Sequence, residues 1–192
     1  MMTPITQEQR RKLVHLSGLL LLPLLPRYPL IVIWVMAGAA VFYLLLEILR
    51  IRGRKLPFFS DFAESCKRPY EMGKIGWAAP LLSLGIILSI LFFDYPATAC
   101  GFVQVCLSDT AAALVGQKWG KAKIFYAPNK KLIGSIAFFL TALVGCLLYI
   151  PLWISLPLAT IGAVLESFPL RDWDNFVIPL GVSFAASLLL WP

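Results

Sequence analysis

An acidic residue interrupts a long apolar stretch near the middle of the chain. Asp109 follows the run ATACGFVQVCL (97–107), and Ala112, Ala113 and Gly116 share its side of a helix. A carboxylate inside a membrane is costly, so it is expected to have a function or a partner. Small residues explain close helix packing but not the acid. Because a hard carboxylate suits Mg²⁺, Asp109 is predicted to be a magnesium ligand beside a nucleotide.

Two further acids lie on opposite sides of a short connection near the C-terminal end. Glu166 precedes this connection and Asp174 follows it, so that both can share a cation with Asp109. Asp174 is also placed to cap the N-terminus of the next helix, a role that is compatible with metal binding. We interpret Asp174 as a second metal ligand and Glu166 as a candidate catalytic group.

The segment RKLVHLSG (11–18) carries the only histidine of the chain. On a helix, Arg11, His15 and Gly18 lie on one face, which can hold an anion with His15 as proton acceptor or phosphate ligand. The alternative is that Arg11 and Lys12 anchor the chain at the membrane surface while His15 is satisfied by a carbonyl group.

The segment APNKKLIGS (127–135) places Lys130 and Lys131 directly before an apolar helix, with Gly134 and Ser135 in its first turn. The N-terminus of a helix, with its free N–H groups, binds phosphate well. The GxxxxGK[ST] spacing of a P-loop is absent. An ordinary lysine-rich flank of a membrane helix is the alternative.

Weaker candidates lie in and before KRPYEMGKIG (67–76). Arg68 and Glu71 can bind a ligand or form a solvated salt bridge in a loop. Glu47 lies one turn before Arg50, and an ion pair at this spacing would satisfy both side chains.

The elements that must position these groups are membrane helices. Hydrophobic residues make up 59% of the 192-residue chain and charged residues 14%, with a mean hydropathy of +0.81; a soluble domain carries about a quarter charged residues. We predict an all-α, polytopic integral membrane protein that forms a single domain over 1–192. Its seven predicted spans are 11–26, 29–50, 75–93, 96–116, 132–150, 152–168 and 175–191.

The basic residues predict the orientation of the chain. With the N-terminus in the cytoplasm, the cytoplasmic loops are 51–74, 117–131 and 169–174. Of the 17 basic residues, 16 lie in these loops, near the N-terminus or at the cytoplasmic end of a span, and only Arg27 lies on the other side. The net charge of +7 therefore reflects membrane orientation, and no nucleic acid partner is expected.

Most acids also gather at the cytoplasmic side. Asp109 lies seven residues before Gly116, about 10 Å from the edge of its span. A transporter would more naturally place such groups at the bilayer midplane. The layout favours an enzyme that joins a water-soluble reagent to a membrane-embedded one.

Taken together and in order, these motifs resemble the polyprenol kinase family, which includes dolichol, phytol and farnesol kinases and CTP-dependent diacylglycerol kinases. The matching segments are RKxxH (11–15), RPxE (68–71), SDxxAAxxGxxxGK (108–121), Lys130 ahead of Gly134-Ser135, and Glu166 followed by Asp174-Asn175 and Pro179. The chain is also distantly similar to CDP-diacylglycerol synthases through SDTxAxxxG (108–116) and PNK (128–130).

The resemblance implies a multi-span enzyme that transfers the γ-phosphate of CTP to a lipid alcohol. Carried over by position, Asp109 and Asp174 belong to the nucleotide–metal site. The expected nucleotide- and phosphate-binding residues are Arg11, Lys12, Lys121, Lys130, Gly134, Ser135 and Asn175.

The expected function is thus a CTP-dependent lipid alcohol kinase at the cytoplasmic membrane face, with Mg²⁺ as cofactor and His15 or Glu166 as the base. The alternatives are a CDP-lipid synthase, and a non-catalytic transporter or scaffold. The kinase is favoured because the synthases end in a signature with a histidine, and none follows His15. The expected location is the cell membrane of a bacterium or archaeon, or a eukaryotic endomembrane. The sequence does not choose between a prenol and diacylglycerol as acceptor, and it indicates no oligomeric state.

Overall fold

Helices make up most of the computed structural model, which describes residues 7–191. Each of the seven predicted apolar segments is helical. The helices are α1 (Gln7–Ser17), α2 (Pro29–Ile51), α3 (Phe59–Ser65), α4 (Ala78–Phe92), α5 (Tyr95–Val103), α6 (Asp109–Trp119), α7 (Leu132–Cys146), α8 (Leu152–Ser167) and α9 (Asp174–Leu190). The first apolar segment is only partly α-helical, because α1 continues into a 3₁₀ helix, η1 (Gly18–Leu24), that contains Pro23.

The lengths and compositions of these helices are those of a membrane protein. Within residues 7–191, three helical stretches are long and apolar enough to cross a bilayer: Pro29–Ile51, Tyr95–Trp119 and Arg171–Leu190. The apolar helices α4, α7 and α8 are shorter. The mostly helical fold is confirmed, whereas the number of spans and the cytoplasmic N-terminus stay predictions.

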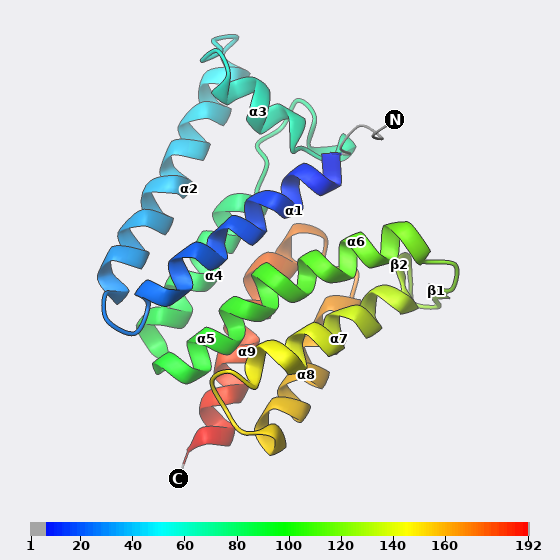
Figure 1. Ribbon diagram of the computed structural model, residues 1–192. Coiled ribbons are helices and arrows are strands. Elements are labelled where there is room, and N and C mark those ends of the chain that lie inside the picture. Colours follow the sequence, from blue (N-terminus) through cyan, green and yellow to red (C-terminus); the bar gives the residue numbers. More distant parts are fainter. Residues whose placement is uncertain (1–6, 192) are drawn as a thin grey trace, which may run out of the picture.

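The central element is the continuous helical run from α5 to α6 (Figure 1, green). Its α5 part packs against α9, and its α6 part packs against α7 and α1. Helix α2 lies at the edge of the bundle, against α4. The α5–α9 crossing needs Gly101, since a Cβ there would lie 2.4 Å from the carbonyl oxygen of Pro179. Every residue of α5 from Ala97 to Val103 is buried, because α5 packs against α4 and α7 as well as α9.

The predicted loops contain secondary structure of their own. The 51–74 segment includes α3 and the 3₁₀ turn η2 (Pro69–Glu71), and the 169–174 segment includes the 3₁₀ turn η4 (Arg171–Trp173). In 117–131, α6 runs on to Trp119, and an antiparallel hairpin of β1 (Lys123–Ile124) and β2 (Ala127–Lys131) follows. The all-α prediction is therefore wrong at this hairpin, whose strands are too short to show a period-2 pattern.

Candidate active site

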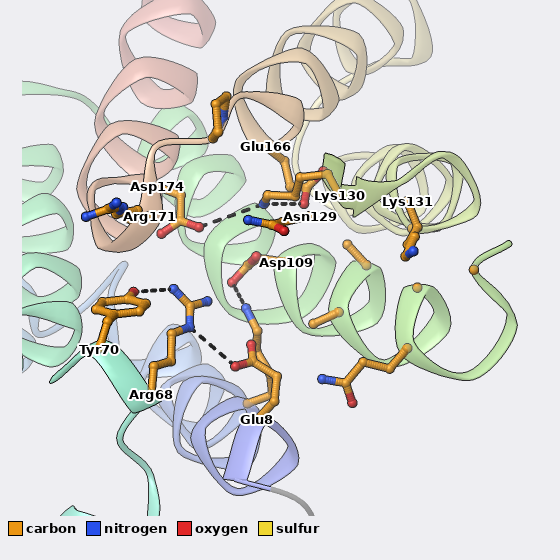
Figure 2. Close-up of a pocket in the computed structure, with 18 residues that line it drawn as sticks. Glu8, Arg68, Tyr70, Asp109, Asn129, Lys130, Lys131, Glu166, Arg171 and Asp174 are labelled. Carbon is orange, nitrogen blue, oxygen red and sulfur yellow. Dashed lines mark hydrogen bonds and ion pairs between the residues drawn. The ribbon is translucent and has the colours of Figure 1, made fainter. Parts of the chain in front are cut away.

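A charged pocket of about 910 Å³ lies where α1, α6, β2, α7 and α8 meet the loops before α4 and α9 (Figure 2). Its basic lining residues are Lys12, Arg68, Lys130, Lys131 and Arg171. Its acidic lining residues are Glu8, Asp109, Glu166 and Asp174. Such a concentration of charge beside apolar helices is expensive unless it is paired or serves a ligand.

Asp109 occupies the first position of α6, directly after a π-helical turn (Gln104–Ser108). Turns of this kind are rare inside helices and are frequent at functional sites. The Asp109 carboxylate is buried and accepts a hydrogen bond from the ammonium group of Lys12 on α1. His15 lies one turn further along α1, with Nδ1 3.7 Å from Asp109 Oδ2. The pair Lys12–Asp109 thus joins α1 to the floor of the pocket.

Lys130 on β2 lies between two further carboxylates (Figure 2). Its Nζ donates to Glu166 Oε1 at 2.6 Å and lies 3.9 Å from Asp174 Oδ2. Burial disfavours the charged form of Lys130, but Glu166, Asp109 and Asp174 outweigh this effect and hold its pKa above the usual value. Lys130 is therefore a fixed cation at the centre of an acidic group of residues.

Contacts between the hairpin and the C-terminal end of α8 hold Lys130 in position. The Tyr126 hydroxyl is 2.6 Å from Ser167 Oγ, which itself donates to the carbonyl of Val164. The Tyr126 ring also lies 5.8 Å from that of Phe168. On the other side, Gly134 lets α7 approach α6, because a Cβ there would lie 2.8 Å from the Ala112 carbonyl oxygen. These contacts bring Lys130 and the first turn of α7 to the pocket.

Asp174 is the first residue of α9, directly after the N-cap residue Trp173, and its metal-binding role stays a prediction. Its Oδ1 accepts the N–H of Asn175 at the start of α9, 2.9 Å away, while its Oδ2 faces Lys130. The Asn175 amide donates to the Ala78 carbonyl at 3.2 Å and is buried. Asn175 therefore joins α9 to α4 and does not line the pocket.

The outer end of the pocket is built around an exposed aromatic ring. Arg68 donates to the Tyr70 hydroxyl at 2.9 Å, and Tyr70 donates to Asp172 at 2.8 Å. The guanidinium of Arg171 lies 5.7 Å from the centre of the same ring. Arg171 has a φ of 53°, a strained value for a residue with a Cβ, and such strain is common at binding sites.

Several predicted site residues lie beside the pocket and not in its lining. Arg11 is buried and pairs with Glu8 on the same helix at 2.6 Å. His15 is buried under Asp109, and its Nδ1 has no hydrogen-bond partner in the described residues. Lys121 is exposed, and Ser135 donates to Glu166 Oε2 at 3.1 Å from the far side.

Glu71 and Glu47 hold the 66–76 segment in place. Glu71 is buried and accepts the backbone N–H of Arg68 at 2.7 Å, so the solvated Arg68–Glu71 salt bridge considered above is not formed. Burial raises the pKa of the Glu71 carboxyl. Glu47 accepts hydrogen bonds from Lys67, from Arg50 at 3.1 Å and from the backbone of Gly76 at 3.1 Å. Neither acid lines the pocket.

The buried position of Glu47 leads to a prediction about stability. Glu47→Gln leaves Lys67, whose side chain is 1% exposed, without a counter-charge, and this should lower the free energy of unfolding by about 3–5 kcal/mol. The measurement is the unfolding midpoint of purified protein in detergent. In the Glu47→Gln/Lys67→Met double variant most of the loss should be recovered. A wild-type midpoint for Glu47→Gln alone would contradict this role.

The pocket lining also includes residues that were not expected from the sequence: Glu8, Tyr70, Gln117, Asn129 and Arg171. Glu8 was recognisable, since it shares a helix face with Lys12 and Arg11. Asn129 belongs to the PNK segment, and Tyr70 lies inside RPxE. The left-handed backbone that turns Arg171 into the pocket has no signal in the sequence.

The acids of the pocket do not form a complete metal site by themselves. Across residues 7–191, no group of three or more His, Cys, Asp or Glu side chains is placed to hold a metal ion. Lys12 and Lys130 lie against the carboxylates instead. This donor set fits a magnesium ion that arrives with a nucleotide, because Mg²⁺ is commonly bound by one or two carboxylates together with substrate phosphates.

The fold and the pocket define a helical membrane protein with a charged site at the end of its apolar helices. No protein-family model matches the chain, and no solved structure matches it. It is 31% identical to CTP-dependent diacylglycerol kinase 1 of Saccharomyces cerevisiae, over 50% of this chain and 43% of the yeast protein. It is 27% identical to the chloroplastic phytol kinase 1 of Arabidopsis thaliana, over 96% of this chain and 67% of the plant protein.

A third relative is an uncharacterized protein of Rickettsia prowazekii, 26% identical over 96% of this chain and 95% of that protein. The chain spans less than half of the yeast kinase and about two thirds of the plant kinase. These weak similarities support a membrane lipid kinase. The predicted likeness to CDP-diacylglycerol synthases stays a prediction.

Proposed function

We propose that the protein is a CTP-dependent lipid alcohol kinase, which transfers the γ-phosphate of CTP to a prenol or diacylglycerol at the cytoplasmic membrane face. The observation that carries this proposal is the alternation of lysines and carboxylates in the pocket. Lys12 pairs with Asp109, and Lys130 pairs with Glu166 near Asp174. Phosphoryl transfer mainly requires positioned charges of this kind.

The ion pairs suit a magnesium–triphosphate complex, because such a complex offers a cation to the carboxylates and phosphate oxygens to the lysines. Asp109 and Asp174 would hold Mg²⁺, which neutralises phosphate charge, and the two lysines, each with three N–H donors, would also donate to the phosphate oxygens. Gly134 at the start of α7 lines the same pocket, where the helix dipole favours an anion. The exposed ring of Tyr70 at the outer end would face the nucleotide base.

Glu166 is the better candidate for the base that accepts the alcohol proton. It lines the pocket, whereas His15 lies buried behind Asp109. In the proposed step the alcohol oxygen bonds to the γ-phosphorus while its proton passes to Glu166. The bond from that phosphorus to the bridging oxygen breaks, and CDP leaves with the electron pair. A carboxylate offers about four acceptor positions, so Glu166 can keep its contacts to Lys130 and Ser135.

The test uses purified protein, Mg²⁺ and CTP labelled at either the γ- or the α-phosphorus, with farnesol, phytol, dioctanoylglycerol and dioctanoyl phosphatidate as acceptors. We expect γ-label in at least one lipid together with release of CDP. Retention of α-label in the lipid with release of pyrophosphate would establish the cytidylyltransferase alternative. If neither label reaches any lipid, the proposed function fails and a non-catalytic role is favoured.

A further inference from the structure

A second, apolar hollow lies next to the charged pocket. It is an open groove of about 600 Å³ between α7, α8 and the β-hairpin. One wall is a stripe of α7 formed by Leu132, Ser135 and Phe139, and the other is a stripe of α8 that includes Ala163 and Val164. These spacings place the residues of each stripe on one helix face. Two facing helices thus form most of the groove, and residues 123–126 of the hairpin complete its lining.

The groove and the charged pocket share a wall. Ser135 lines the groove, and its hydroxyl donates to Glu166 Oε2 at 3.1 Å. Glu166 lines the charged pocket, where its other oxygen accepts from Lys130 at 2.6 Å. One carboxylate therefore lies between an apolar groove and a site for phosphate. Its distance from the Ser135 hydroxyl is that of a single hydrogen bond.

The groove is open on the outer side of the bundle. Leu132 and Val164 are exposed, and Phe125 at the tip of the hairpin is 92% exposed. Both helices are apolar, so lipid chains are the surroundings that such a surface takes in a bilayer. Hydroxyl groups in the groove are concentrated at its hairpin end, where Ser167 contacts Tyr126. The groove is therefore amphipathic, with its polar end toward Glu166.

We propose that this groove binds the hydrocarbon chain of the acceptor alcohol and presents its hydroxyl at Ser135 to Glu166. This inference rests on the proposed kinase activity and adds the location of the acceptor. An amphipathic alcohol matches the groove because its chain replaces bilayer lipid along Phe139 and Ala163 while its hydroxyl reaches the polar end. CTP enters separately through the charged pocket, so the two substrates meet at Glu166.

The test combines labelling with kinetics on the full chain in lipid nanodiscs. A farnesol derivative with a diazirine at its hydrocarbon end should label the α7 and α8 peptides that line the groove, and unlabelled farnesol should compete. Ala163→Trp, which fills the groove, should raise the KM for the lipid alcohol about tenfold or more and leave the KM for CTP unchanged. Thr160 lines the groove on the same face of α8, and Thr160→Phe should also raise the KM for the lipid alcohol.

Leu140→Trp is the matched control, because Leu140 is exposed on α7 but does not line the groove; its kinetics should stay close to wild type. Labelling elsewhere, labelling that farnesol does not compete, or a wild-type KM for the alcohol in both filled variants would overturn the acceptor site while leaving the kinase intact. The labelling experiment needs no turnover, so it reports on the groove even if no phosphate transfer is found.

Discussion

Asp109→Asn is expected to lower the kcat of phosphate transfer by about 100- to 1,000-fold. The amide keeps the size of the side chain and one hydrogen-bond acceptor for Lys12, but it removes the charge proposed to hold Mg²⁺. The measurement is the initial rate of γ-label transfer at saturating CTP over a series of magnesium concentrations. The variant should also need more Mg²⁺ for its residual activity, which a purely structural role would not cause.

A control must separate this effect from loss of folding. The side chain of Lys12 is 3% exposed, and an unpaired buried lysine destabilises a protein by about 3–5 kcal/mol. Lys12→Met combined with Asp109→Asn removes the orphaned charge, so this double variant should regain thermal stability. It should not regain activity. Wild-type kcat in either folded variant would exclude Asp109 from the catalytic machinery.

The helical part of the fold could be predicted because a membrane leaves few alternatives. Backbone groups in lipid must be satisfied within the segment, so each long apolar run had to be helical. The β-hairpin could not be predicted in this way. Its strands are held by tertiary contacts such as that between Tyr126 and Ser167, and APNKK has no alternating pattern.

The candidate site was partly predictable for a related physical reason. Asp109, Glu166 and Asp174 were selected because acids in or beside apolar helices are too costly to lie there without a role, and the structure brings all three to one pocket. The sequence could not predict which charged side chains form ion pairs with each other. Glu47 was matched to Arg50 by helical spacing, whereas the fold also brings Lys67 to it from a distant loop.

Because the sequence does not reveal tertiary contacts, His15 and Glu166 were equal candidates for the base. Both have suitable side chains, and only their surroundings distinguish them. His15 Nδ1 lies 3.7 Å from Asp109 Oδ2, but His15 does not line the pocket. Glu166 has one oxygen toward Lys130 and the other toward Ser135. The choice between them rests on tertiary structure and is open to a direct test.

Glu166→Gln should lower kcat by about 100- to 10,000-fold, the contribution typical of a general base, with little change in the KM for CTP. The amide preserves shape and can still contact Ser135, but it cannot take up the alcohol proton. Rates of γ-label transfer measured at saturating CTP and acceptor give kcat directly. His15→Gln is the matched comparison, and it should retain activity within about tenfold of wild type because His15 does not line the pocket.

Ser135→Ala separates proton transfer from the positioning of Glu166. It removes the 3.1 Å hydrogen bond but leaves the carboxylate and its contact to Lys130, so the loss in kcat should be well below that of Glu166→Gln. Because the acceptor hydroxyl is proposed to lie at Ser135, the KM for the alcohol should rise more than the KM for CTP. The reverse pattern, with His15→Gln inactive and Glu166→Gln active, would assign the proton to the histidine. In that case the alcohol would have to approach from α1, and the proposed acceptor site between α7 and α8 would be wrong as well.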